Sequence, residues 1–346
     1  MNVSNHIIKW YEKNKRNLPW RRTKDPYKIW VSEIILQQTK VKQGIPYYYK
    51  FIENFPTVKD LALASEDEVL SLWQGLGYYS RARNLHISAK LIFNNFSGIF
   101  PDNYNDILKL KGVGDYTASA ISSFCYSLPH AVVDGNVIRF LSRFFAIDIP
   151  FDTNEGKKTF KNIAQEILDK KNPDIHNQAI MEFGALQCTP KKPICSSCLL
   201  SDNCKAFTAK NVEKFPVKKN KVKVKTRFIH YFLASKENNF LFKKKQSGIW
   251  KGLYDLPCIE FTKEVSKNKI LECKEFKDLF IDNFLKIKQV SKKITYKVTH
   301  QKLQIFFWHI SVSDSIEDYT FFHIKDIVKL PKSNLVNNYF NSFALK

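Results

Sequence analysis

Apolar residues in the first 210 positions of the chain recur at steps of three and four, which is the spacing of one helix face. Trp30, Ile34, Val41 and Ile45 follow this spacing. Residues that stop helices divide the region into segments of helix length, and these are Gly75, Gly77, Pro101, Pro129 and Pro150. The pattern predicts that residues from about 5 to 210 are mainly α-helical.

The pattern changes after residue 228, where apolar and aromatic residues follow the two-residue period of a strand. Strands are predicted at 228–233, 240–242, 294–299 and 303–310, with a helical segment at 275–286. We therefore predict a second domain of the α+β class over residues 228–346.

Residues 210–227, between the two regions, have seven lysines and one arginine against a single acidic residue, Glu213. Such a run is a solvated linker by default, and it can also touch a DNA backbone.

The composition is that of a folded protein, because 44% of the 346 residues are hydrophobic and only 25% are charged. The charge balance is unusual: 55 Lys+Arg against 33 Asp+Glu give a net charge of +22. This excess favours a polyanionic partner, through contacts with phosphates and release of counterions. A generally lysine-rich proteome would produce the same excess, so charge alone does not decide.

No apolar run of signal-peptide length occurs in residues 1–16, and no stretch reaches the ~18 consecutive apolar residues of a membrane span. We expect an intracellular, cytoplasmic protein that associates with DNA and with no membrane. In that setting the seven cysteines are expected to be ligands or buried thiols rather than disulfides.

Four cysteines form the most specific motif of the chain, Cys188-x6-Cys195-x2-Cys198-x5-Cys204. Four thiolates at such short spacing can surround one compact metal centre with a structural role, because they leave no open position for a substrate. The spacing leaves zinc and an iron–sulfur cluster both open, and buried thiols without metal are the plainer alternative. The remaining cysteines lie alone and are expected to be structural: Cys125, Cys258 and Cys273.

Two glycines, in Gly112-Val113-Gly114, directly precede a predicted helix start, with apolar segments on both sides. Glycines allow a tight turn, and the backbone amides at a helix N-terminus can hold a phosphate. A helix corner without any ligand would have the same sequence.

Two acidic residues stand in unusual surroundings. Glu33 has large apolar neighbours, and burial would raise its pKa into the range of a general acid. Asp134 follows the apolar residues 131–133 and begins Asp134-Gly135-Asn136-Val137. A solvated helix face for Glu33 and a simple helix cap for Asp134 are the alternatives.

In this order the motifs resemble the helix–hairpin–helix base-excision superfamily with a [4Fe–4S] cluster, and within it the adenine DNA glycosylases of the MutY type. The resemblance runs from about Trp10 to Cys204 and rests on Glu33 with Leu36-Gln37-Gln38-Thr39, the Gly75–Ala82 stretch, Gly112-Val113-Gly114, Asp134-Gly135-Asn136-Val137 and the four cysteines. The resemblance favours a [4Fe–4S] cluster over zinc. It also favours functional roles for Glu33 and Asp134 over a solvated helix face and a simple helix cap.

The resemblance implies a mainly α helix–hairpin–helix glycosylase region at 1–209. A six-helix barrel-like part would span about 25–130, and an iron–sulfur part would combine 1–24 with 131–209. After the basic linker 210–227, residues 228–346 would form a Nudix-like α+β domain that reads 8-oxoguanine. Ser247–Tyr254 matches the family's Ser-Gly-Leu-Trp-type stretch, while Val298-Thr299-His300 departs from its Phe-Ser-His. The acidic box of true Nudix hydrolases is absent after Gly252, which disfavours a metal-dependent pyrophosphatase.

The same resemblance implies the roles of single residues. The catalytic set would be Glu33, Asp134, Tyr116 and Asn136, with Glu33 protonating the adenine and Asp134 stabilising the oxocarbenium ion. Adenine contacts would come from Arg21, Gln178 and Glu182. DNA contacts would come from Gln38, Thr39, Leu76, Tyr78, Gly112, Gly114, Thr299 and His300. The partner would be double-stranded DNA with adenine opposite 8-oxoguanine or guanine, bound by a monomer.

Two rival functions are compared with this hypothesis. An endonuclease III type glycosylase that also cuts the strand has a lysine nucleophile where this chain has Tyr116. A DNA-binding protein without activity would not need both Glu33 and Asp134. The sequence therefore favours a monofunctional adenine glycosylase.

Overall fold

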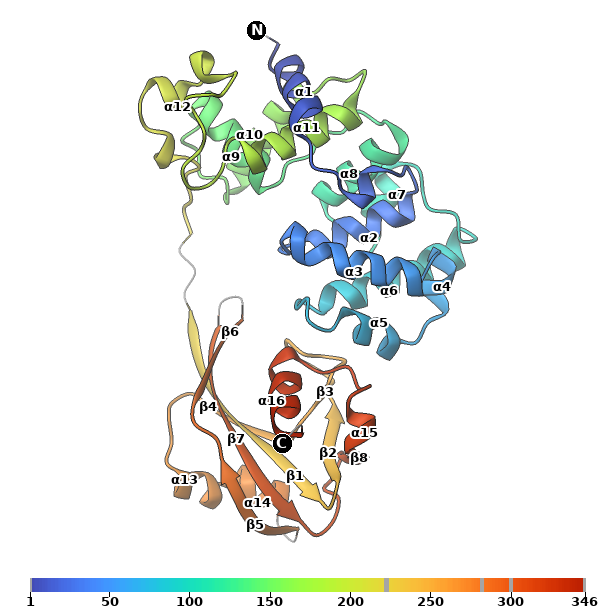
Figure 1. Ribbon diagram of the computed structural model, residues 1–346, viewed down its shortest axis with the longest axis vertical. Helices are drawn as coiled ribbons and strands as arrows, with labels where there is room; N and C mark the ends of the chain where they lie inside the picture. The colour runs from blue at the N-terminus through green and yellow to red at the C-terminus, as the bar shows by residue number, and fades with distance from the viewer. Residues whose placement is uncertain (1, 221–223, 281–282, 299–300, 345–346) are drawn as a thin grey trace. The chain divides into compact units, whose positions relative to one another are not determined.

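The computed structural model describes residues 2–220, 224–280, 283–298 and 301–344 (Figure 1). The chain divides into two compact units, Met1–Leu63 with Asn84–Lys221 and Ala64–Arg83 with Val222–Lys346. Residues 64–83 thus lie in the second unit, although the sequence placed them in the helical region.

The first unit is built from helices and contains the hairpin and the cysteine loop. Its elements are α1 (Val3–Asn14), η1 (Pro19–Arg21), α2 (Pro26–Leu36), α3 (Val41–Asn54), α4 (Val58–Leu63), the greater part of α6 (Ser80–Asn95), α7 (Tyr104–Leu108), α8 (Asp115–Tyr126), α9 (Gly135–Phe145), α10 (Asn154–Ile167), α11 (Pro173–Leu186), η2 (Ser201–Asn203), α12 (Lys205–Thr208) and η3 (Val212–Lys214).

Two groups of helices meet along α11 (Figure 1). One group brings α1, α9 and α10 together with the cysteine loop, and the other brings α3 and α7 together with α2 and α8. Helix α11 packs against α1, α8 and α9 and so joins the groups. Helix α2 is apolar on nearly every side, and Trp30, Val31 and Ile35 in it are fully buried.

Local sequence signals explain where these helices begin. Pro26 opens α2 and the Asp25 carboxylate accepts the Tyr27 N–H at 3.0 Å. In α10 the Thr153 hydroxyl caps the first turn by accepting the Gly156 N–H at 3.0 Å.

The second unit contains an eight-stranded mixed sheet. Its elements are α5 (Glu66–Trp73), β1 (Lys225–Lys236), β2 (Asn239–Lys244), β3 (Tyr254–Asp255), β4 (Cys258–Phe261), α13 (Lys267–Glu272), α14 (Lys274–Phe280), β5 (Phe284–Val290), β6 (Ile294–Val298), β7 (Gln301–Val312), β8 (Thr320–His323), α15 (Ile324–Ile327) and α16 (Asn334–Ala344). The order is β3-β2-β1-β7-β5, with β4 on β1, β6 on β7 and β8 on β2.

The central strands β1 and β7 run parallel and are covered on both faces. On one face Phe232 packs against Phe276 and Phe280 of α14. On the other, Phe307 stacks on Tyr339 of α16 with the ring centroids 3.7 Å apart. Cover on both faces explains why β1 has a continuous apolar run rather than strict alternation.

Three of the predicted strands are longer in the structure, and the strand predicted at 294–299 is present as Ile294–Val298, with residue 299 outside the described residues. The helical region and the α+β class of the second domain are confirmed, and all four predicted strands exist. The helical prediction at 275–286 is wrong in its last third, because α14 ends at Phe280 and β5 begins at Phe284. Within the part of the chain that the structure describes, no helix is long and apolar enough to cross a membrane.

The basic linker is attached to the first unit over its first half. The Phe151 N–H donates to the Val217 carbonyl at 3.1 Å, and Asp152 accepts the amides of Lys219 and Asn220 at 2.8 and 2.9 Å. The last three residues of the predicted linker, 225–227, belong to β1, which begins at Lys225.

Gly156 packs α10 directly onto the backbone of Pro150 and Phe151. Phe151 is also one of the residues that bind the linker. A Cβ atom at Gly156 would lie 2.1 Å from the Pro150 carbonyl oxygen. We expect Gly156→Ala to lower the free energy of unfolding by about 1–3 kcal/mol, because overpacking outweighs the better helix propensity of alanine. Urea unfolding would measure it. The exposed neighbour variant Lys158→Ala should stay within about 0.5 kcal/mol, and equal stability of both variants would contradict the packing argument.

Candidate active site

Glu33 lies on α2 with only 6% of its surface exposed. Its Oε2 accepts a hydrogen bond of 2.8 Å from the Tyr116 hydroxyl on α8. Burial, with a smaller contribution from the charge of Asp134, raises the pKa of Glu33 to about 7, although the bond from Tyr116 and the charge of Arg21 oppose this rise. Near neutral pH this carboxyl therefore holds a proton in a substantial part of the molecules.

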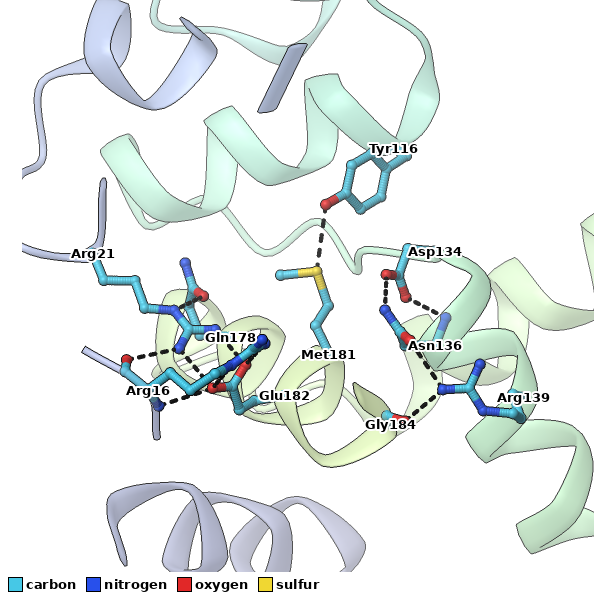
Figure 2. Close-up of polar contacts among 10 residues, drawn as sticks. All are labelled: Arg16, Arg21, Tyr116, Asp134, Asn136, Arg139, Gln178, Met181, Glu182 and Gly184. Atoms are coloured by element: carbon cyan, nitrogen blue, oxygen red, sulfur yellow. Dashed lines mark hydrogen bonds and ion pairs between the residues drawn. The ribbon is translucent and has the colours of Figure 1, made fainter. Parts of the chain in front are cut away.

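Tyr116 also contacts Met181 of α11, with its hydroxyl 3.4 Å from the sulfur (Figure 2). Sequence reasoning missed Met181. Its position could have been inferred, because Gln178, Met181 and Glu182 are three and four residues apart and share one face of α11.

Asp134 is the N-cap of α9, as the simplest interpretation of its sequence predicts. Its Oδ1 accepts the backbone amides of Asn136 at 2.9 Å and Val137 at 2.8 Å, and its Oδ2 accepts the Asn136 side-chain amide at 2.6 Å. Burial raises the pKa of Asp134, while these three hydrogen bonds and the charge of Arg139 counteract the rise. Its charge also acts on the pKa of both Glu33 and Tyr116, so the three groups belong to one site.

Asn136 continues the polar contacts toward the cysteine loop (Figure 2). Its Oδ1 accepts a hydrogen bond of 2.9 Å from Arg139, which also donates to the Gly184 carbonyl at 2.5 Å and to the Cys188 carbonyl at 2.7 Å. Gly184 permits this approach of α11 to α9, because a Cβ there would lie 2.6 Å from the Asn136 carbonyl oxygen.

Arg21, Gln178 and Glu182, which the sequence grouped as base contacts, do lie together (Figure 2). Arg21 donates to Gln178 at 2.9 Å and to both carboxylate oxygens of Glu182 at 3.0 and 2.9 Å. Arg16 also binds both oxygens. Burial would raise the pKa of Glu182, but the two arginines lower it to about 2. Glu182 is thus a buried anion whose two oxygens already accept hydrogen bonds from arginines.

The glycine hairpin is exposed and connects α7 to α8. Gly112 has φ of +81°, and a Cβ there would lie 2.8 Å from Asn84, so the turn requires glycine. Gly114 caps α8, and no atom lies within 4 Å of where its Cβ would be. A phosphate could therefore approach the first amides of α8 closely. The neighbouring Asp115 is neutralised by Lys161, whose Nζ lies 2.7 Å from its Oδ1.

The four clustered cysteines line one small cavity of about 30 Å³ next to α9 and α11, together with apolar side chains such as Phe140 and Phe183. Among the described residues, no three His, Cys, Asp or Glu side chains are arranged to hold a single metal ion. Four thiol groups that face one cavity are a donor set that suits either a zinc ion or a four-iron cluster.

Arg143 of α9 organises the cysteine loop from inside and is only 3% exposed. It donates to the carbonyls of Thr189 at 2.7 Å and Pro190 at 3.1 Å, and its Nη1 lies 3.4 Å from the Cys188 sulfur. A further bond of 3.2 Å goes to the Val212 carbonyl, at the start of the linker. One cation thus stabilises both the loop and the segment that follows it.

The remaining predicted DNA contacts are distributed over both units. Gln38 is exposed with φ of +56°, and the Thr39 hydroxyl donates weakly to the Gln37 carbonyl, 3.5 Å away. Leu76 and Tyr78 lie in the second unit, where Leu76 is buried and Tyr78 is 41% exposed. Thr299 and His300 lie outside the described residues.

Comparisons with known proteins identify the family of the chain. A sequence model of the HhH-GPD superfamily base excision DNA repair proteins matches residues 31–170. The adenine DNA glycosylase of Buchnera aphidicola subsp. Baizongia pistaciae is 37% identical over 308 residues, which are 86% of this chain and 83% of that protein. The adenine DNA glycosylase of the same species from Acyrthosiphon pisum is 41% identical over 72% of each chain.

Among solved structures, a thermostable thymine-DNA glycosylase matches 60% of this chain and 95% of its own, with a TM-score of 0.56 and 28% identity. Both adenine DNA glycosylases are more than 30% identical to this chain, and the match covers more than two thirds of each. This identity, together with the fold, assigns the chain to their family. The chain belongs to the adenine DNA glycosylases, enzymes of base-excision repair within the HhH-GPD superfamily.

Proposed function

We propose that this glycosylase removes adenine paired with 8-oxoguanine or guanine, using Glu33 as the acid and Asp134 as the anion that stabilises the sugar cation. The observation that carries the proposal is the contrast between the two carboxyls. Glu33 is buried with one hydroxyl donor, while Asp134 accepts three N–H donors.

Protonation solves the central difficulty of the reaction. An undamaged adenine is a poor leaving group, and it must first be flipped out of the duplex at a cost of a few kcal/mol. Glu33 would give its proton to adenine N7. The bond between C1′ and the base then breaks with its electron pair going to the base, so neutral adenine leaves. Glu33, now a carboxylate, would accept a proton from the water that attacks the sugar.

Asp134 would remain ionised during this step, because its three hydrogen bonds favour the carboxylate. A fixed negative charge next to the sugar stabilises an oxocarbenium ion, and the two carboxyls divide the work as in sugar hydrolysis. Asn136 would orient Asp134, and Tyr116 would hold the Glu33 carboxyl in place.

The extruded base would be held by one face of α11 and by Arg21. Gln178 and Arg21 already share a hydrogen bond, and Met181 offers a soft apolar surface beside Tyr116. Because Glu182 is held by two arginines, we propose that it mainly fixes Arg21 in place, and a contact to the base would require sharing one of those bonds.

The remaining predicted contacts complete the proposal. The amides beside Gly112 and Gly114 would hold a phosphate near the flipped nucleotide, and Gln38 and Tyr78 would fill the gap in the base stack. Thr39 and Leu76, with Thr299 and His300, would face the opposite base. Excision assays on duplexes with adenine opposite 8-oxoguanine, guanine or thymine test this specificity.

We further propose a [4Fe–4S] cluster on Cys188, Cys195, Cys198 and Cys204. Their shared cavity supports it. A bound cluster would supply a rigid cross-link for the loop. In this proposal the helical region 1–209 excises the adenine, and the domain 228–346 reads the 8-oxoguanine.

Replacing Glu33 with glutamine tests the acid. Glutamine keeps the acceptor for Tyr116 but has no proton to give, so we expect single-turnover excision to fall by a factor on the order of 10² to 10⁴ with duplex affinity retained. The control is Glu53→Gln, an exposed change on α3 that should leave the rate unaltered. Excision by Glu33→Gln at the wild-type rate would exclude the role.

Thermal unfolding of the same variant provides a second reading. The pKa of Glu33 is raised in the folded state from 4.5 to about 7, so the stability that goes with its protonated form is present below pH 4.5 and is lost as pH rises through 7. Because glutamine does not ionise, the variant does not lose this stability as pH rises. The Tm of Glu33→Gln at pH 8.5 should equal or exceed that of the wild type, and a clear decrease would show that the carboxyl is not destabilised by burial.

The pH dependence of excision follows from the same groups. At saturating enzyme the rate should fall as pH rises above about 7, where Glu33 loses its proton. It should also fall in acid, where Asp134 becomes protonated, at a pH above the ordinary range for aspartate because its pKa is raised. A bell-shaped profile is therefore expected. A rate that keeps rising to pH 9 would contradict Glu33 as the acid.

Iron analysis tests the cluster. The purified protein should contain about four iron atoms per chain and absorb visible light as a brown protein. We expect Cys198→Ser to lose both properties, while Cys273→Ser, a cysteine of the second unit, should retain them. One zinc atom in place of iron would show that the cluster assignment is wrong.

A further inference from the structure

The turn that carries Leu76 and Tyr78 has an unusual backbone. Gly75, Gly77 and Tyr78 all have positive φ, at 108°, 73° and 49°. Glycine accepts such angles readily, but tyrosine does so at a cost, so a tyrosine in this region persists only where its surroundings hold it.

A segment distant in the sequence, Lys329–Asn334, supplies contacts that hold this turn. The Asn334 side-chain amide donates to the Gly75 carbonyl at 3.2 Å, and the Tyr79 hydroxyl donates to the Lys332 carbonyl at 3.1 Å. The Ser71 hydroxyl donates to the Lys329 carbonyl at 3.2 Å. The segment thus contacts residues on both sides of Leu76, and all of these residues belong to the second unit.

Lys332 stiffens the segment itself. Its side chain is fully buried, and its ammonium donates to the carbonyls of Ile327 and Leu330. Burial lowers the pKa of Lys332 to about 8. A lysine in this position is costly, and its function in the fold is to fix the backbone that accepts the bond from Tyr79.

The turn and its support border an open cavity of the second unit. Leu76 and Tyr78 line this cavity together with Trp250, Tyr296 and Val298, and Asn334 of the support lines it too. The support therefore holds the turn at the edge of a space that can receive a ligand. The shape of the turn determines which surface Leu76 and Tyr78 offer to that space.

We propose that Lys329–Asn334 is a positioning element that fixes the Gly75–Tyr79 turn, so that Leu76 and Tyr78 present one defined shape to the base opposite the extruded adenine. This inference rests on the proposed function, and it assigns Lys332 and Tyr79 to specificity rather than to catalysis.

A separate anchor in the same unit provides the control. Lys244 of β2 forms an ion pair with Asp67 in the first turn of α5, with Nζ 2.6 Å from Oδ1. Gly252 brings the preceding loop against α5, since a Cβ there would lie 2.9 Å from Glu66. Loss of the Lys244 contact loosens α5 at its start without touching the turn.

The test measures affinity of the full chain for duplexes with adenine opposite 8-oxoguanine or guanine, in the Glu33→Gln background. The ratio of the two Kd values reports discrimination. Tyr79→Phe removes one hydroxyl bond and keeps the ring, so we expect the ratio to fall by about twofold to tenfold. With Glu33 restored, single-turnover excision at saturating enzyme should change by less than about twofold. Hydrogen exchange at residues 74–79 should become faster, while α2 keeps its protection.

Lys332→Met should lower the ratio of the two Kd values further. If Lys332→Met does not fold, the ratio measured for Tyr79→Phe decides the test. Lys244→Ala should leave the ratio unchanged. An unchanged ratio in Tyr79→Phe, or an equal decrease in Lys244→Ala, overturns the positioning role. The same Kd for both duplexes in the chain that carries only Glu33→Gln overturns the proposed reading of the opposite base and this inference with it. Two different Kd values whose ratio stays the same in every variant overturn the inference alone.

Discussion

Burial of one carboxyl group, that of Glu33, is the constraint on which the site depends. Water would stabilise the charged form, but α2 packs this side chain among large apolar residues and gives it a single hydroxyl donor. The neighbouring Asp134 is also removed from water, yet the first amides of α9 point at it. Burial raises the pKa of both carboxyls, and at Asp134 three N–H donors and the charge of Arg139 counteract that rise.

Helix α9 links this carboxylate to the cysteine loop. It begins at Asp134, and on successive turns Arg139 and Arg143 donate to carbonyls around Cys188. A shift of the loop would move the side chains that hold Asn136, and with it the cap on Asp134. The side chains of α9 therefore connect the cysteine loop mechanically to the site. This gives a structural reason for cysteines placed so far along the chain from Glu33.

The second unit includes a segment that the order of the sequence would assign to the other unit. Residues 64–83 precede much of the helical region, yet they pack in the unit that contains the sheet. The ion pair of Lys244 with Asp67 and the bond of Tyr79 to the Lys332 carbonyl join the two. A Leu-Gly-Tyr turn from one part of the sequence is thus supported by a lysine more than two hundred residues later.

The sequence by itself determined the classes of structure, the strand and helix positions, the cysteine motif and the acids, because periodicity and spacing along the chain are local properties. It also placed the cap at Asp134 correctly. It did not find Met181, the engagement of Glu182 by Arg16 and Arg21, or the end of α14 at Phe280. Those features depend on which side chains meet across elements, and hydrogen bonds between distant residues leave no periodic signal. The burial of Glu33 and Asp134 and the number of donors that each carboxyl has were likewise decided only by the tertiary structure, because packing sets both.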